Sequence, residues 1–256
     1  MKRKITPAQR RHADYLRKKG LKVGLAYETR LRRLRRKEVS RLLSLCKDVS
    51  NTAAWEDVIA LQLDESYLGK WYSGLYVDAG LPQAKSTARD MSRGKSEPKE
   101  DYWRSALLDR AEERAGEEIV LLEGTFRDEL VGVVRKTMTA SPELGVEALA
   151  RKILKGYGEI ELWQARRIAQ TETMISLAEA GDIAARTLDV GFNKQWIISG
   201  LGNTRETHEI MDGVIVDMDE PFELEDCMMM YPHDGSMGAP AGEIINCACG
   251  VLRLPK

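Results

Sequence analysis

The spacing of apolar residues changes along this chain near residue 190. Up to that point apolar side chains recur every three to five positions, as at Leu31, Leu34 and Val39, close to the period of an amphipathic helix. Beyond it, short apolar runs such as residues 196–198 are separated by turn residues, which is typical of strands. The pattern predicts an α+β fold: a long helical N-terminal region followed by a small mixed α/β C-terminal module with a short antiparallel sheet.

Capping and breaking residues set the ends of the first predicted helices. Thr6 fits the N-cap of a helix, and Gly20 fits the stop that ends it. A second, arginine-rich helix is predicted through residues 27–49. Asn51 or Thr52 is expected to cap the helix that follows.

Composition divides the chain into three predicted segments. Residues 80–100 are rich in Gly, Pro, Ser and charged side chains, and they predict a mobile loop. Helical periodicity resumes after it and continues to about residue 188, with a break expected at Gly181. The predicted segments are a basic helical segment over 1–50, a helical region over 51–158 that contains the loop, and the C-terminal module over 159–256.

Three strands are predicted in the C-terminal module, at residues 192–199, 212–221 and 243–254. In the last of these, Cys247 and Cys249 would lie on the same face because strand side chains alternate. Neighbouring positions on one face are about 6.5–7 Å apart, so a disulfide within the pair is not expected.

The net charge of −1 conceals a strong asymmetry along the chain. Residues 1–41 contain 16 basic and 3 acidic side chains, a net charge of +13, and the remainder has a net charge of −14. A basic helix of this kind favours sequence-independent contact with a polyanion, although a solvated basic face is the simpler alternative. The candidate polyanion-binding residues are Arg30, Arg32, Arg33, Arg35, Arg36 and Lys37.

Three of the four cysteines and two of the three histidines lie in the C-terminal module. Thiolate and imidazole are the ligands that zinc prefers, so this module could assemble a zinc site. The candidate ligands are His208, Cys227, His233, Cys247 and Cys249. The C-x-C spacing differs from that of zinc fingers, and cysteine packs well in a protein core. Packed thiols beside a hydrogen-bonded histidine are therefore the preferred interpretation; no cofactor is expected, and zinc is the alternative.

A catalytic Cys–His pair is the alternative to a structural role for these residues. Such a pair needs a third group to orient the imidazole, and Asp212 would share a helical face with His208. The chain contains no Gly-rich nucleotide loop, H-E-x-x-H or G-x-S-x-G motif. The sequence therefore predicts a protein that is not an enzyme. A Cys/His-dependent or zinc-dependent enzyme and a non-specific DNA-binding protein are the alternatives.

Polar residues in the stretch 202–222 are expected to hold irregular backbone in place. Arg205 could bind a carboxylate or the backbone of the C-terminal strand. Asp212 and Gly213 form a turn signal, and Thr204 could cap a short helix that carries His208. The expected structural motif comprises Arg205, His208, Asp212, Gly213, Pro221, Phe222, Asn246, Cys247 and Cys249.

The order of these residues resembles a known protein family. The matching positions are Thr204, Arg205, His208, Asp212, Gly213, Pro221, Phe222, Pro232, Asp234, Glu243, Asn246, Cys247 and Cys249, preceded by the helix "RRIAQTETMISLAEAG". Over about residues 160–253 the chain resembles the phage head morphogenesis family, which includes Mu F-like and SPP1-type minor head proteins of tailed bacteriophages.

The resemblance implies a structural minor capsid protein inside the procapsid near the portal vertex, made in the host cytoplasm and acting in assembly, packaging or ejection. It implies contact with the portal protein, with major capsid or scaffold proteins, and in some members with double-stranded DNA. It implies no catalytic residues. Some members fuse this domain to toxin domains; the chain ends three residues after the matched region, so none is expected here. The chain contains no run of about 18 apolar residues, so no membrane span is predicted.

Two consequences of this interpretation concern stability. If the basic segment only binds partners, deleting residues 1–41 should leave the C-terminal module folded. Replacing Cys247 with Ser should destabilise the module, because the hydroxyl would be buried without an assured partner.

Overall fold

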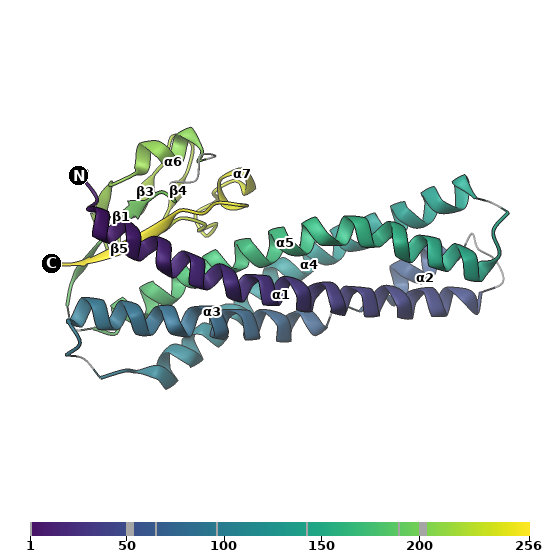
Figure 1. Ribbon diagram of the computed structural model, residues 1–256, viewed down its shortest axis with the longest axis horizontal. Helices are drawn as coiled ribbons and strands as arrows, with labels where there is room; N and C mark the ends of the chain where they lie inside the picture. The colour runs from purple at the N-terminus through teal and green to yellow at the C-terminus, as the bar shows by residue number, and fades with distance from the viewer. Residues whose placement is uncertain are drawn as a thin grey trace. The chain divides into compact units, whose positions relative to one another are not determined.

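The computed structural model describes residues 2–49, 54–64, 66–95, 97–141, 143–188, 190–199 and 204–256. It confirms the α+β class. The helices are α1 (Pro7–Lys47), α2 (Trp55–Gln62), α3 (Tyr67–Ser92), α4 (Glu100–Ala140), α5 (Val146–Arg186), α6 (Glu206–Met211) and α7 (Ala241–Ile244) (Figure 1). The strands are β1 (Phe192–Ile197), β2 (Ile215–Asp217), β3 (Phe222–Glu223), β4 (Met228–Met229) and β5 (Gly250–Pro255). The expected caps Asn51 and Thr52 lie outside the described residues.

The chain forms two compact units that each gather segments distant in sequence. The first contains Met1–Ala26, Ser73–Arg110 and Arg167–Lys256, and the second contains Tyr27–Tyr72 and Ala111–Arg166. The divisions between them fall inside α1, α3, α4 and α5. No described helix is long and apolar enough to cross a membrane.

Helix α1 begins where the sequence predicts and continues through the expected stop. Thr6 Oγ1 accepts a hydrogen bond from Gln9 N at 3.2 Å, and Gln9 Oε1 accepts one from Thr6 N at 2.9 Å, which is a reciprocal capping box. The expectation that Gly20 ends the helix is wrong, because α1 continues to Lys47. A Cβ at Gly20 would collide with the Leu177 side chain of α5. Gly20 therefore allows close packing of two helices.

The mobile loop predicted over 80–100 is wrong for most of its length. Residues up to Ser92 belong to α3, and α4 starts at Glu100. The buried face of this part of α3 includes Ala84 and Ala88, which belong to one apolar cluster with Trp103 of α4. Alanine contributes little to hydrophobic periodicity but is the best helix former, so the composition hid a buried helix.

The second unit has its own core, built on Trp55, Phe126 and Tyr157 with surrounding aliphatic residues. Polar groups are buried beside it. Glu161 is fully buried and accepts from Arg36 Nε at 2.7 Å, and Arg35 donates to Gln164 Oε1 at 3.3 Å.

The C-terminal module of the first unit is a three-stranded antiparallel sheet in the order β2-β1-β5, with a separate β3-β4 pair. The strands predicted at 192–199 and 212–221 are confirmed by β1 and β2. The last predicted strand starts too early, because α7 occupies part of it and Asn246 has a φ of 58°. The extended chain resumes only at Gly250, so Cys247 and Cys249 precede β5.

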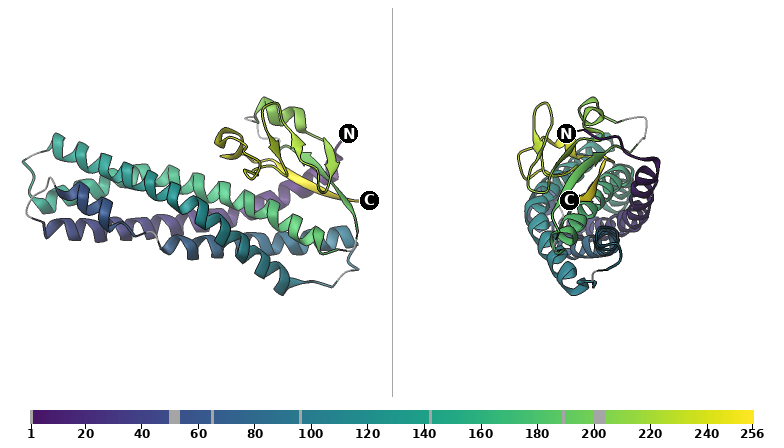
Figure 2. Two further views of the ribbon diagram at one scale, coloured as in Figure 1. Left: turned by 180° about the vertical axis from the view of Figure 1, so that it is seen from behind. Right: turned by 90° about the vertical axis from the view of Figure 1, so that its left-hand side faces the viewer.

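The N-terminal residues are built into this module. Lys2 forms a bridge with Val214, and Arg3 N donates to Gly213 O at 2.9 Å. Arg10 Nη2 lies 2.7 Å from Asp212 Oδ2. Both chain ends lie beside the sheet in Figure 1, and the two other views in Figure 2 agree.

The expected helix break at Gly181 is also wrong, because α5 continues to Arg186. The glycine instead leaves room for the guanidinium of Arg253 from β5, which donates to Ala178 O. Burial lowers the pKa of Arg253 to about 10.

Candidate functional site: a buried His–Cys–Cys cluster

The candidate site forms where the loop before β5 meets helix α6. Asn246 adopts a left-handed conformation that turns the chain, and Asn246 N lies within hydrogen-bond distance of Thr171 Oγ1 on α5, at 3.3 Å. Arg205 Nη2 donates to Ile245 O at 2.6 Å. This bond confirms one of the two roles expected for Arg205, a grip on backbone near the C-terminal strand.

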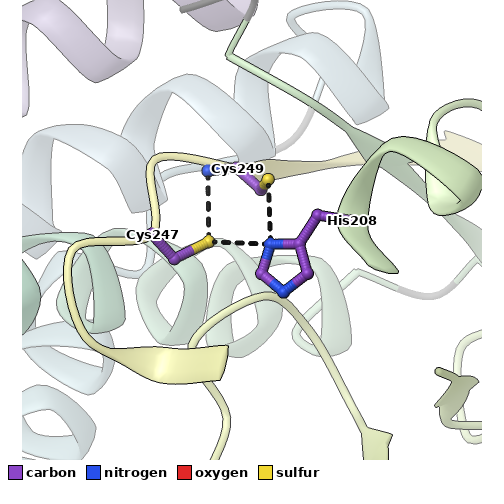
Figure 3. A group of neighbouring side chains, drawn as sticks. All are labelled: His208, Cys247 and Cys249. Carbon is purple, nitrogen blue, oxygen red and sulfur yellow. Dashed lines mark hydrogen bonds between the residues drawn. The ribbon is translucent and has the colours of Figure 1, made fainter. Parts of the chain in front are cut away.

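These constraints aim two sulfur atoms at one imidazole nitrogen. Figure 3 shows that both sulfur atoms face the same nitrogen of the His208 ring. Cys247 Sγ lies 3.4 Å and Cys249 Sγ lies 3.5 Å from His208 Nδ1. All three side chains are buried, with 5% or less of each residue exposed. The Trp196 ring packs edge-on against the imidazole at a centroid distance of 5.2 Å and closes the site from the sheet side.

The two thiols are electrostatically different. A hydrogen bond from Cys249 lowers the pKa of Cys247, and the Cys249 backbone N–H, 3.4 Å from Cys247 Sγ, acts in the same direction. The same sulfur–sulfur interaction together with burial raises the pKa of Cys249. Cys247 is therefore the first of the pair to become a thiolate, the form that binds metals and acts as a nucleophile.

The opposite edge of the imidazole faces a carboxylate. His208 Nε2 lies 2.8 Å from Glu243 Oε2 on α7, a close contact that is not aligned as a hydrogen bond. Thr207 Oγ1 donates to the same carboxylate oxygen at 3.1 Å. A carboxylate behind a histidine is the usual support of a metal-bound imidazole, since it fixes the ring and favours a proton on the distal nitrogen.

The two sulfur–nitrogen distances are those expected around a tetrahedral zinc ion. With Zn–S of about 2.3 Å and Zn–N of about 2.0–2.1 Å, two ligand atoms at the tetrahedral angle lie about 3.6 Å apart. The observed sulfur–nitrogen distances of 3.4 and 3.5 Å are close to this value. A ring nitrogen has either one lone pair or one proton, so it can form a good hydrogen bond with only one of the two sulfur atoms. A single cation between the three atoms would be coordinated by both sulfurs and the nitrogen.

Only part of the ligand set expected from the sequence comes together. His208, Cys247 and Cys249 offer atoms that all lie within 4.8 Å of one another. His233 is buried nearby with Nε2 3.0 Å from Cys249 O, so it holds the backbone of the loop. Cys227 packs against the same core at its partly buried edge and is not in the cluster formed by the described residues.

Asp212, Gly213 and Phe222 of the expected motif hold the fold together in the structure. Asp212 does not face His208 as expected: Asp212 Oδ1 accepts from Ile198 N at 3.0 Å and its other oxygen pairs with Arg10. The reason is that α6 ends at Met211. Gly213 has a φ of +83° and makes the predicted turn, and Phe222 is buried against Trp196. The helix cap is Arg205 and not Thr204.

The candidate polyanion-binding residues do not form one exposed row. Arg35 is 1% exposed and lies over the Phe126 ring, so it is not available to an external polyanion. Arg36 is committed to the buried Glu161. Arg30 lies over Tyr27 while remaining exposed. Polyanion contact through Arg30, Arg32, Arg33 and Lys37 stays a prediction.

A buried lysine is a second unusual group in the module. Lys194 on β1 is 1% exposed, and its Nζ donates to Met230 O at 2.8 Å. Burial lowers its pKa to about 8. Asp182 and Arg186 of α5, with Arg253 and Asp219, are the charged groups that act on it.

Stability should rise with pH as Lys194 loses its proton. Because its folded pKa lies below the ordinary 10.5, the charged form opposes folding fully below pH 8, and this opposition fades up to pH 10.5. We expect the free energy of unfolding of the native protein, minus that of Lys194→Met, to increase by about 3 kcal/mol over this range. Urea unfolding at several pH values measures it. Lys18→Met, at an exposed position, should give a flat difference; a flat profile for Lys194→Met would contradict the assignment.

The chain is similar in sequence to a protein that carries the name of an enzyme. No family model matches it, and no solved structure matches it. A curated relative, NAD(+)–arginine ADP-ribosyltransferase EFV of Enterococcus faecalis (strain ATCC 700802 / V583), is 28% identical over 265 residues. The match covers 93% of this chain and 48% of the relative, so the chain spans about half the length of that protein.

This relative overturns the functional interpretation of the sequence. The chain was expected to be a structural minor head protein of a virion and not an enzyme. The relative carries the name of an enzyme, a transferase, and nothing in its name concerns capsids. The enzyme alternative, which the sequence ranked second, agrees better with this finding.

Sequence reasoning missed three residues that complete the site. In the sequence, Glu243 and Thr171 stand out only through the family resemblance, and Trp196 only as part of a predicted strand. In the structure Glu243 and Trp196 contact the His208 ring, and Thr171 lies beside the backbone of Asn246. Each lies at least twelve residues from His208 along the chain, so no local spacing could connect them to it.

Proposed function

We propose that this chain is part of an enzyme of the ADP-ribosyl-transferring class, and that its C-terminal module is held together by zinc bound to His208, Cys247 and Cys249. The observation that carries the zinc proposal is the pair of sulfur atoms aimed at one imidazole nitrogen. The transferase class comes from the relative, which matches most of this chain.

The burial of the cluster favours a structural role for the metal. Three protein ligands leave a fourth zinc position for a water molecule or for Cys227, which packs at the edge of the same core. Cys247 enters as a thiolate most readily, and Glu243 would hold the metal-bound imidazole by its distal nitrogen. Bound zinc would supply a cross-link between α6 and the loop before β5.

We also propose that residues 160–253 share the fold of the phage head morphogenesis domain. The order of matching residues supports this, and several of them, including Arg205, His208 and Glu243, lie around the cluster. The proposal concerns the domain alone.

Metal content tests the zinc proposal directly. The purified full chain is expected to contain about one zinc ion per molecule by mass spectrometry of the metal. His208→Ala and Cys249→Ala should lose it, whereas His12→Ala, which removes a half-exposed histidine, and Cys46→Ala should keep it. Cys227→Ser decides the fourth ligand. Metal-free wild-type protein would contradict the proposal.

The transferase proposal has its own assay. The full chain is incubated with an arginine-rich acceptor protein and NAD+ labelled in its ADP-ribosyl part. The label should move to an acceptor guanidinium as the bond between ribose and nicotinamide breaks and nicotinamide is released. Acceptor in which arginine is replaced by lysine is the control. Unlabelled acceptor would confine the proposed function to zinc binding.

A further inference from the structure

A groove in the first unit has no part in the cluster described above. It opens among α1, α3 and α4 with a volume of about 780 Å³, within the range of small-molecule sites. Its floor is apolar and fixed. Leu81 and Ala88 are buried there, and the buried Trp103 donates its Nε1 proton to Thr187 Oγ1 at 3.1 Å.

The rim of this groove is cationic. Lys19 from α1, Arg89 from α3 and Arg104 from α4 line it and are exposed. A fourth lining cation, Lys85, is neutralised by Glu100 at 2.7 Å. Arg89 Nε lies 3.8 Å from Asp90 Oδ1, a long and exposed ion pair that leaves the Arg89 side chain 70% exposed. Asp78 is the acidic residue among the described lining residues. Three separate helices therefore converge positive charge on one concave surface, an arrangement suited to a ligand with more than one negative charge.

An exposed aromatic ring stands at the same groove. Tyr15 lines it with 61% of the residue exposed, although tyrosine is usually more buried than this. A solvent-facing aromatic ring beside cations is the combination that binds nucleotides, because a base stacks on the ring while phosphates meet the cations. Pro82 offers a further apolar surface in the lining.

We propose that this groove binds a nucleoside diphosphate group, with the base on Tyr15 and the diphosphate between Lys19, Arg89 and Arg104. The source of the group is either a free nucleotide such as ADP or a dinucleotide such as NAD+, which contains the same unit. If the ligand is NAD+, the groove is the nucleotide site of the proposed transferase, and this part of the proposal rests on the proposed function.

Calorimetric titration of the full chain tests the proposal with ADP, NAD+, pyrophosphate and adenosine. ADP should bind at least tenfold more tightly than pyrophosphate or adenosine, because each of these lacks one of the two recognised parts. The variant R89A/R104A should bind ADP at least tenfold more weakly. Tyr15→Ala should weaken ADP binding about five- to tenfold, the scale of one base stack. Lys22→Ala, an exposed α1 cation outside the lining, should leave binding unchanged.

The outcomes separate this inference from the proposed function. Three results would contradict nucleotide binding in the groove. They are the absence of saturable ADP binding, equal affinity for ADP and pyrophosphate, and an unchanged affinity for ADP in both R89A/R104A and Tyr15→Ala. ADP binding that follows the variants, without label transfer from NAD+, would keep the groove and remove the transferase. Label transfer with an unchanged KM for NAD+ in R89A/R104A would support the transferase and contradict nucleotide binding in the groove.

Discussion

Replacing His208 with alanine is expected to lower the melting temperature of the protein by about 10 °C, which corresponds to a loss of about 3–5 kcal/mol. The substitution removes a ligand of the proposed zinc ion and leaves the Cys247 and Cys249 sulfurs facing a cavity. It also removes the imidazole that lies 2.8 Å from the Glu243 carboxylate. Removal of metal from the wild-type protein with a strong chelator should produce a similar shift, because binding free energy is folding free energy for such a site. Differential scanning calorimetry with and without chelator measures both.

The comparison of the two shifts distinguishes metal from simple packing. If zinc holds the module, chelator should change the wild-type melting temperature and leave that of His208→Ala unchanged. If the thiols only pack, chelator should change neither protein, while the substitution still destabilises. His12→Ala controls for loss of a histidine and should stay within about 0.5 kcal/mol of the wild type, as surface substitutions do.

Deleting residues 2–26 is expected to unfold the first unit altogether. Arg3 supplies a backbone hydrogen bond to Gly213 and accepts another from Gln195 Nε2 at 2.7 Å. Gly20 and Gly24 of the same segment pack directly on Leu177 and Thr173 of α5. Loss of these contacts should abolish the near-ultraviolet circular dichroism of the buried Trp196 and expose the C-terminal module to protease. This reverses the expectation that the module folds without residues 1–41.

A charge-removal variant provides the matched control. Arg11→Gln, Lys18→Gln and Lys22→Gln together remove three exposed positive charges from the same stretch of α1 and leave its glycines and strand contacts intact. This variant should melt with the wild type while binding heparin more weakly. A folded, protease-resistant module in the truncated protein would contradict the packing argument.

Much of the local structure follows from the sequence. The switch from helical to alternating periodicity near residue 190 gave the α+β class, and Thr6 with Gln9 fixed the start of α1. The turn at Gly213 was equally readable, since it needs a positive φ. The glycines at 20 and 181 misled, because a helix stop and a close helix contact both favour a residue without Cβ.

Periodicity and caps act over a few residues, so the sequence alone specifies most of the helices and strands and the chemical groups that the C-terminal module holds. Which of these groups meet depends on the fold of the whole chain. His208 and Cys247 are 39 residues apart, and the turn at Asn246 and the grip of Arg205 bring them within 3.4 Å. The same packing buried Arg35, separated His233 and Cys227 from the cluster, and gathered Lys19, Arg89 and Arg104 around one groove. Convergence of this kind depends on the chain path through three dimensions, which no local spacing encodes.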